Sequence, residues 1–225
     1  MIFLKILSKY LFYLSALLLI PLSLAAFYQL FPENHPQPHS TFAFLFTFAI
    51  SILLALTLRW FGRKATGSLY RRESILLVVL IWIITSLISA LPFTLSGTLG
   101  PLNAYFEAMS GLTTTGATML SPKAYHSLTG TEVPIHLTNL HVPEKTYVYY
   151  GTVAPIRDPS TGLILYSGIE AVGKALLLWR SLLQWIGGMG IVVIFLAVLP
   201  ILGVGGKFLY QMEPSGLLKN EISPR

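Results

Sequence analysis

The sequence contains a run of hydroxyl side chains around one glycine, Thr113-Thr114-Thr115-Gly116-Ala117-Thr118. Threonine-rich chain around a glycine is a poor helix former, so the backbone carbonyl oxygens of the run would lack partners within it. At membrane depth such backbone is tolerated only where it is buried in protein or lines a watery cavity. Carbonyl oxygens in that position can replace water around a dehydrating monovalent cation. Gly116 can adopt a positive φ angle, which would turn consecutive carbonyls toward one axis.

A short apolar segment, Pro101–Leu112, directly precedes this run. Pro101 fits the first position of a helix, where its missing amide costs nothing. A helix over this segment would be about 16 Å long, roughly half the ~30 Å hydrocarbon thickness. It could therefore enter the bilayer without crossing it, with its partly negative C-terminal end aimed at the threonine run. The residues alone leave two readings open, a re-entrant pore helix with a carbonyl-lined loop or an interfacial loop with a threonine-rich turn.

The composition indicates a membrane protein. Apolar residues make up 54% of the 225 positions and charged residues only 11%, whereas a soluble domain carries about 25% charged residues. So much apolar surface also excludes a disordered chain. The absence of cysteine excludes a disulfide framework, a thiolate metal site and a cysteine nucleophile. We expect an all-α integral membrane protein.

Four stretches are long and apolar enough to cross a bilayer, and backbone in hydrocarbon must then be helical. They cover about residues 10–31, 42–61, 74–95 and 175–202. The first follows Lys5 and Lys9 and contains a small-x-small site at Ser23-Leu24-Ala25, so a cleaved signal peptide is the alternative. Because the apolar run continues through Phe31, we expect a retained span.

Lysine and arginine side chains indicate the orientation of these spans. They gather at the N-terminus, in the linker between the second and third spans and in the C-terminal tail, whereas residues 32–40 contain none. By the positive-inside rule both termini are expected in the cytoplasm. The net charge of +6 then reflects topology and membrane lipid, and we expect no nucleic-acid partner.

Two motifs occur in order along the chain, FEAMSGLTTTGAT at residues 106–118 and LWRSLLQWIGGMG at residues 178–190. The first closely resembles the first pore loop of the Trk/Ktr/HKT potassium transporter superfamily. The second resembles the TrkH branch of that superfamily, and the tail continues the likeness through residues 199–206, Glu213 and Pro224-Arg225. The resemblance covers nearly the whole chain and is weakest in the loop after the threonine run.

In that superfamily two leading helices precede four repeats of helix, pore loop and helix, and the four loops converge on one pore. The resemblance implies a leading transmembrane hairpin in residues 1–66 and the first repeat in residues 67–225, with an extended outer loop at about residues 120–171. It implies potassium uptake across the plasma membrane, the inner membrane of a bacterium, with K⁺ as the transported ion and no covalently bound cofactor. The implied partners are the remaining pore-loop repeats, a cytosolic nucleotide-binding regulatory subunit and a second copy of the full transporter in a homodimer.

Carried over residue by residue, the resemblance implies main-chain ion ligands at Thr113, Thr114, Thr115 and Gly116, with K⁺ held above all at Thr114 and Thr115. Ala117 and Thr118 would support the outer end of the loop. This chain has one such loop where the superfamily needs four. We therefore expect the N-terminal part of a longer or split gene product rather than an assembly of four copies. A non-conducting truncated subunit or scaffold is the alternative function.

Several residues in the helical segments around the threonine run suggest further roles. Glu107 is costly on an apolar pore helix unless it faces water or a partner. It could concentrate cations near the entrance or hydrogen-bond the support of the helix; a surface carboxylate in the vestibule is the alternative. Arg180 is expected near the outer end of the fourth span, where it could snorkel as a structural residue. Three small residues would permit close helix packing or a bend beside the pore: Gly187, Gly188 and Gly190.

The outer loop contains two β-prone segments, residues 146–150 and 163–166, and a turn-forming cluster at residues 158–162. This pattern is compatible with a small β-hairpin or cap. The scattered His and Glu residues of the loop match no helical metal motif, so we expect no second metal site there: His126, Glu132, His136, His141 and Glu144. The sequence has no nucleophile elbow, HExxH or P-loop, and we expect no enzyme.

Overall fold

The computed structural model describes residues 2–31, 39–64, 71–126, 130–138, 146–158 and 160–198. Its helices are α1 (Ile2–Leu30), α2 (Ser40–Gly62), α3 (Arg71–Leu95), α4 (Pro101–Leu112) and α5 (Lys174–Val198). Within these described ranges, four helices are long and apolar enough to cross a membrane, namely α1, α2, α3 and α5. The expected all-α membrane fold is confirmed. The tail motif at residues 199–206, Glu213 and Pro224-Arg225 lies outside the described residues, as do His141 and Glu144.

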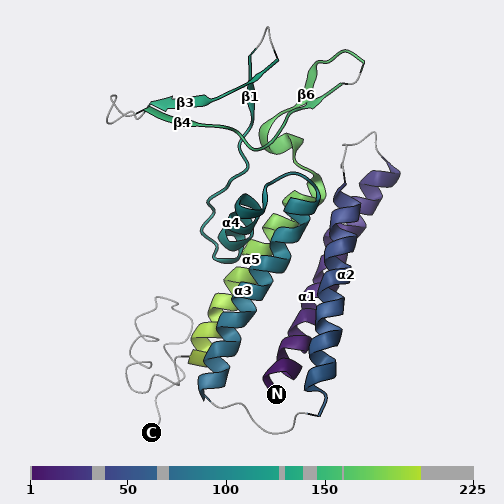
Figure 1. Cartoon of the computed structure of the whole chain (residues 1–225), viewed down its shortest axis with the longest axis vertical. Helices are drawn as coiled ribbons and strands as arrows, with labels where there is room; N and C mark the ends of the chain where they lie inside the picture. The colour runs from purple at the N-terminus through teal and green to yellow at the C-terminus, as the bar shows by residue number, and fades with distance from the viewer. Residues whose placement is uncertain are drawn as a thin grey trace, which may run out of the picture.

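The helices form two groups (Figure 1). α1 and α2 lie side by side as an antiparallel pair, and α3 and α5 run next to each other with the shorter α4 beside the halves that lie nearer the strands. The strands lie together beyond that same end of the molecule. α1 begins at Ile2 rather than near Tyr10, because leucine, isoleucine and lysine in the first turns all sustain a helix.

Small side chains bring α1 and α2 together. The buried face of α2 carries Ala43, Thr47, Ser51 and Ala55 at four-residue spacing, which is the helical repeat that lines one face. The hydroxyl of Ser15 on α1 donates to the Ser51 hydroxyl at 2.7 Å. At the other end of the pair a Cβ on Gly62 would lie 2.9 Å from the backbone nitrogen of Lys5. Close approach of this kind is the usual basis of helix association in lipid.

Trp179 of α5 connects the two groups of helices. Its side chain is fully buried and meets the Phe44 ring edge-on, at 6.3 Å between centroids and 83° between planes. The indole nitrogen donates to the carbonyl oxygen of Ser89 on α3 at 3.1 Å. A buried indole with its N–H satisfied contributes apolar area at no polar cost, so this residue holds α5 against both α2 and α3.

The described part of the outer loop contains three antiparallel strand pairs. They are β1 (Ala124–Tyr125) with β2 (Glu132–Val133), β3 (Ile135–Thr138) with β4 (Thr146–Tyr149) and β5 (Ile156–Arg157) with β6 (Ile164–Tyr166). A short 3₁₀ helix, η1 (Gly168–Ala171), leads into α5.

Both segments expected to be β-prone are strands, but they do not pair with each other. β4 pairs with β3, and β6 pairs with β5 across the predicted turn. In that turn the Asp158 carboxylate accepts hydrogen bonds from the Ser160 amide at 2.9 Å and the Ser160 hydroxyl at 2.7 Å. The bonds from Ser160 and Thr161 hold the pKa of Asp158 below its ordinary value.

Candidate functional site

Helix α4 has the boundaries that the sequence predicts. Gly100 precedes it in an extended conformation and Pro101 occupies its first turn, where a proline is preorganised for helix. Toward its end Gly111 packs against α5, because a Cβ there would lie 3.1 Å from the Leu183 Cβ atom. The helix stops at Leu112, where the threonine run begins.

The four residues Thr113, Thr114, Thr115 and Gly116, here called the TTTG segment, leave the helix in an unusual backbone conformation. Thr114 has a φ of 56° and Gly116 a φ of 77°. A left-handed φ is easy for glycine but strained for a β-branched residue. The amides of the three threonines donate back to α4 at 2.8, 3.1 and 3.1 Å, to the carbonyl oxygens of Met109, Gly111 and Ser110 respectively.

The carbonyl oxygens of the TTTG segment differ from its amides in their hydrogen bonding. Within the part of the chain that the structure describes, none of the four accepts a hydrogen bond, and all four residues are exposed. The hydroxyls of Thr113 and Thr115, by contrast, are hydrogen-bonded locally. That of Thr113 donates to the Met109 carbonyl at 2.9 Å and lies 2.8 Å from the Thr115 hydroxyl. The segment therefore exposes main-chain carbonyl oxygens that have no partner among the described residues.

Side chains of α4 hold the chain that follows the TTTG segment through hydrogen bonds. The Ser110 hydroxyl donates to the Ala117 carbonyl at 2.6 Å. The Glu107 carboxylate, fully buried, accepts from the Thr118 hydroxyl at 3.0 and 3.1 Å and from the Met119 amide at 2.7 Å. Both Ala117 and Thr118 are thus bound to α4 side chains.

Glu107 is paired with an arginine from the far end of the sequence. The Arg180 Nε of α5 forms an ion pair with Glu107 Oε1. The hypotheses of a cation-concentrating or vestibule-facing carboxylate are wrong because the side chain has no exposed surface. The snorkelling interpretation of Arg180 is also wrong, because its guanidinium turns into the protein and is only 19% exposed. An unpaired charge at this depth would be costly, so each side chain requires the other.

The three glycines of α5 face different neighbours. A Cβ on Gly187 would lie 1.8 Å from the Leu112 carbonyl oxygen, so only glycine lets α5 meet the end of α4. A Cβ on Gly188 would be 4.0 Å from the Thr114 Cγ2 atom, and one on Gly190 would be 3.8 Å from the Trp82 ring. The last two distances are ordinary contacts, so the tight fit is confined to Gly187.

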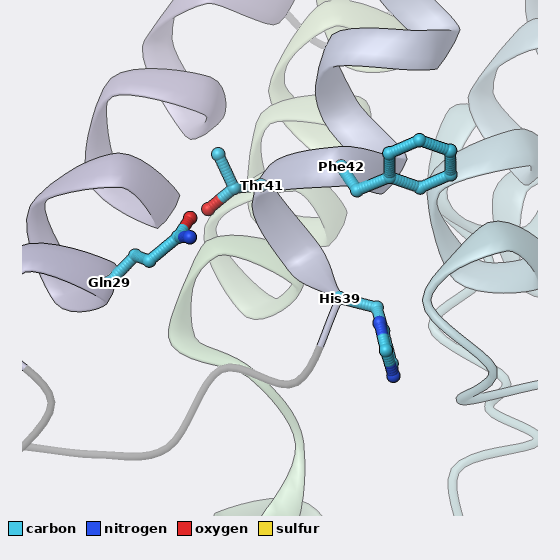
Figure 2. A pocket seen from close by; sticks show the side chains of 4 residues that line it. All are labelled: Gln29, His39, Thr41 and Phe42. Carbon is cyan, nitrogen blue, oxygen red and sulfur yellow. The ribbon is translucent and has the colours of Figure 1, made fainter.

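Two other places among the described residues bring polar side chains together. A pocket of about 230 Å³ between the end of α1 and the start of α2 is lined by Gln29, His39, Thr41 and Phe42, with Gln29 and Thr41 pointing toward each other (Figure 2). None of these residues belongs to the loop after α4. In the outer loop Glu132 pairs with Lys123 at 3.0 Å, and the described residues hold no cluster of three potential metal ligands.

Known proteins share this architecture and sequence. A family model described as TrkH, "Cation transport protein", matches residues 157–225. The Trk system potassium uptake protein TrkH of Escherichia coli K12 is 36% identical over 186 residues, which are 81% of this chain and 29% of that protein. The chain belongs to the TrkH branch of the Trk potassium transporter superfamily.

Two further TrkH-branch proteins extend the match along the chain. The Trk system potassium uptake protein TrkG of Escherichia coli K12 is 29% identical over 212 residues, 92% of this chain and 32% of that protein. The crystal structure of the potassium transporter TrkH from Vibrio parahaemolyticus superposes with a TM-score of 0.59 at 25% identity, covering 93% of this chain and 36% of the other. The chain thus spans about a third of the length of these TrkH-branch relatives. With the apolar helices α1, α2, α3 and α5 it is a multi-pass membrane protein.

Sequence reasoning missed two supports of the TTTG segment in this TrkH-branch chain. The Glu107–Arg180 pair joins residues 73 positions apart, and no spacing rule relates such distant charges. The contact of Thr152 with the end of the loop, described below, comes from a region without periodic pattern. For the Glu107–Arg180 pair the sequence offered one signal, an acidic residue on an otherwise apolar helix, which needs a partner.

Proposed function

We propose that this chain supplies one carbonyl-lined segment of the cation pathway of a potassium uptake transporter. The observation that carries the proposal is the TTTG segment, whose carbonyl oxygens lack partners among the described residues while the chain around them is held in place. Free carbonyls at the end of a half-length helix suit a monovalent cation that has shed its water. The relatives named as potassium uptake proteins support potassium as that cation.

The proposal assigns roles to the parts of the chain. Residues 1–66 form the leading hairpin, and residues 67–225 form the first helix, pore loop and helix repeat with its outer loop at about residues 120–171. Thr113, Thr114, Thr115 and Gly116 provide the main-chain ligands, with K⁺ at Thr114 and Thr115 as substrate. Glu107, Ala117 and Thr118 support the segment, and the glycine at position 187 lets α5 pack against the end of α4.

The fold and the family support a proposal for the orientation and the partners of the chain. The basic residues near the start of α1 and the end of α2 lie at the end of the bundle opposite the strands (Figure 1), which supports cytoplasmic termini in a bacterial inner membrane. One segment gives only part of a coordination shell. The remaining pore-loop repeats must come from further sequence or other chains, and a nucleotide-binding regulatory subunit and a second copy of the transporter are the proposed partners.

A growth assay tests the proposal. A bacterial strain without potassium uptake systems receives the chain together with the sequence encoded directly downstream of it. We expect growth at low K⁺ and rubidium uptake, both lost in Gly116→Asp at unchanged protein level. Gly97→Asp is the matched control, since Gly97 has a φ of 75° and equally open surroundings. If Gly116→Asp transports as well as the control, the TTTG segment is not the ion path, and the chain is a non-conducting subunit.

A further inference from the structure

The chain leaves the TTTG segment through Met119, and both backbone groups of this residue are bound. Its amide donates to the Glu107 carboxylate at 2.7 Å. Its carbonyl oxygen accepts from the Thr152 hydroxyl, which comes from the outer loop 33 residues further along the chain. One residue therefore receives a contact from the pore helix on one side and from the outer loop on the other.

Residues 151–153, here called the return segment, pack closely against the chain that follows Met119. The amides of Thr152 and Val153 both donate to the Ser121 carbonyl at 2.9 Å, and the Lys123 amide donates to the Val153 carbonyl at 2.9 Å. The Thr152 hydroxyl also accepts from the Ser121 amide at 3.1 Å. These hydrogen bonds pair backbone groups of the return segment with those of residues 121–123, as buried polar groups require.

The return segment approaches the backbone of Pro122 most closely at Gly151. A Cβ on Gly151 would lie 2.0 Å from the Pro122 carbonyl oxygen, so glycine is the residue that lets the two backbones meet. Val153 beside it is 5% exposed and belongs to the hydrophobic core. The strands beyond the return segment differ, because β4 is exposed along its whole length. The outer loop is thus anchored next to the TTTG segment by the return segment and is solvent-facing along β4.

We infer that the return segment is a positioning element for the proposed ion pathway, acting on the TTTG segment through Met119 together with Glu107 and Arg180. The inference rests on the proposed function and adds a role for the outer loop. Met119 lies three residues beyond Gly116. A shift of the Met119 peptide groups would move the carbonyl oxygens of the TTTG segment as well. The two residues in between, Ala117 and Thr118, are themselves held by hydrogen bonds and cannot absorb the shift.

Thr152→Val tests the inference, since valine keeps the shape and removes all three hydrogen bonds of the hydroxyl, those with the Met119 carbonyl, the Ser121 amide and the Ser121 carbonyl. We expect the KM for rubidium uptake, or its ratio to the inhibition constant for Na⁺, to change about fivefold, the factor that one average hydrogen bond carries. Maximal uptake at matched protein amount should change less. Thr152→Ser should restore the wild-type ratio because it keeps the hydroxyl. Thr138→Val is the matched control, an exposed threonine on β3 of the same outer loop.

A double variant examines the shared route through Met119. If Glu107→Gln and Thr152→Val both act on this residue, their combined effect on the ratio should fall clearly short of the product of the single effects. Multiplicative effects, or a Thr152→Val variant that behaves like Thr138→Val, would overturn the inference.

A structural readout separates this inference from the proposed function. Hydrogen exchange at residues 119–121 should accelerate in Thr152→Val and stay unchanged in Thr138→Val. Where Gly116→Asp abolishes uptake but Thr152→Val alters neither exchange nor the uptake ratio, the inference fails and the proposed function stands. Where Gly116→Asp leaves uptake intact, the proposed function fails, and this inference falls with it even if exchange accelerates.

Discussion

The α1–α2 pair and the α3–α4–α5 unit are stabilised in different ways. The pair relies on small residues, an interhelical bond between Ser15 and Ser51 and the close approach at Gly62. The unit contains a buried charge pair and a glycine pressed onto a carbonyl oxygen. Continuous helices satisfy their own backbone in lipid, whereas a helix that stops halfway leaves groups that other residues must satisfy. Single substitutions should therefore damage the unit more than the pair.

The largest effect is expected at Glu107. Glu107→Leu leaves Arg180 without its partner and the Met119 amide without an acceptor, which should lower the free energy of unfolding by about 3–5 kcal/mol. Unfolding in mixed detergent micelles measures this loss. Adding Arg180→Leu should recover part of it, because an apolar pair is tolerated where a lone charge is not.

Glu132→Leu provides the matched control for the charge. Its partner Lys123 forms an exposed ion pair, and such pairs contribute less than about 1 kcal/mol. Equal losses in Glu107→Leu and Glu132→Leu would contradict the importance of the buried pair.

The next effect is expected at Gly187. A methyl group there would overlap the Leu112 carbonyl oxygen, and no rotamer relieves a clash with backbone, so Gly187→Ala should cost about 3 kcal/mol, the upper end of the overpacking range. Gly188→Ala, one residue on, meets only an ordinary contact and should be neutral or slightly stabilising. Thermal unfolding of the two variants side by side decides the point; similar midpoints would show that α4 and α5 are not tightly seated.

A third prediction concerns the strain at Thr114. Thr114→Gly should raise the free energy of unfolding by about 1 kcal/mol, since glycine adopts the left-handed φ without cost. If the strain serves ion coordination, the same variant should lower rubidium uptake despite greater stability. A variant that is both more stable and fully active would show that the conformation of Thr114 is incidental to transport.

In the α1–α2 pair the expected effect is smaller. Removing both hydroxyls with Ser15→Ala and Ser51→Ala should reveal a coupling of about 0.6 kcal/mol, the average for hydrogen bonds between membrane helices. A coupling as large as that between Glu107 and Arg180 would erase the contrast between the two regions.

The smallest effect lies in the outer loop. Because the Asp158 pKa is lowered mainly by the Ser160 hydroxyl, the ionised form stabilises the folded turn. This contribution is present above the ordinary pKa and is lost as the pH falls through the lowered one. Asp158→Asn should therefore reduce hydrogen-exchange protection in β5 and β6 at neutral pH and remove its acid dependence. Unchanged protection would show that the turn does not depend on the carboxylate.

The sequence predicted features that depend on local chemistry. Pro101 and the threonine run bound α4 correctly because one starts helices and the other ends them. It did not predict contacts between distant segments. The pairing of β4 with β3 depends on which strand lies nearer in space, and the alternation of Ile135-His136-Leu137-Thr138 was too short to identify β3. The partner of Glu107 is equally remote, since a single arginine on α5 carries no signal of what it faces.

The packing of Trp179 gives this chain an internal optical probe. Two of the other three tryptophans, Trp60 and Trp185, are more than half exposed, and replacing all three with phenylalanine would leave one indole wedged between Phe44 and the Ser89 carbonyl. Its emission wavelength would then report whether the α1–α2 pair stays docked against α5 when a lipid, an ion or a further chain is added.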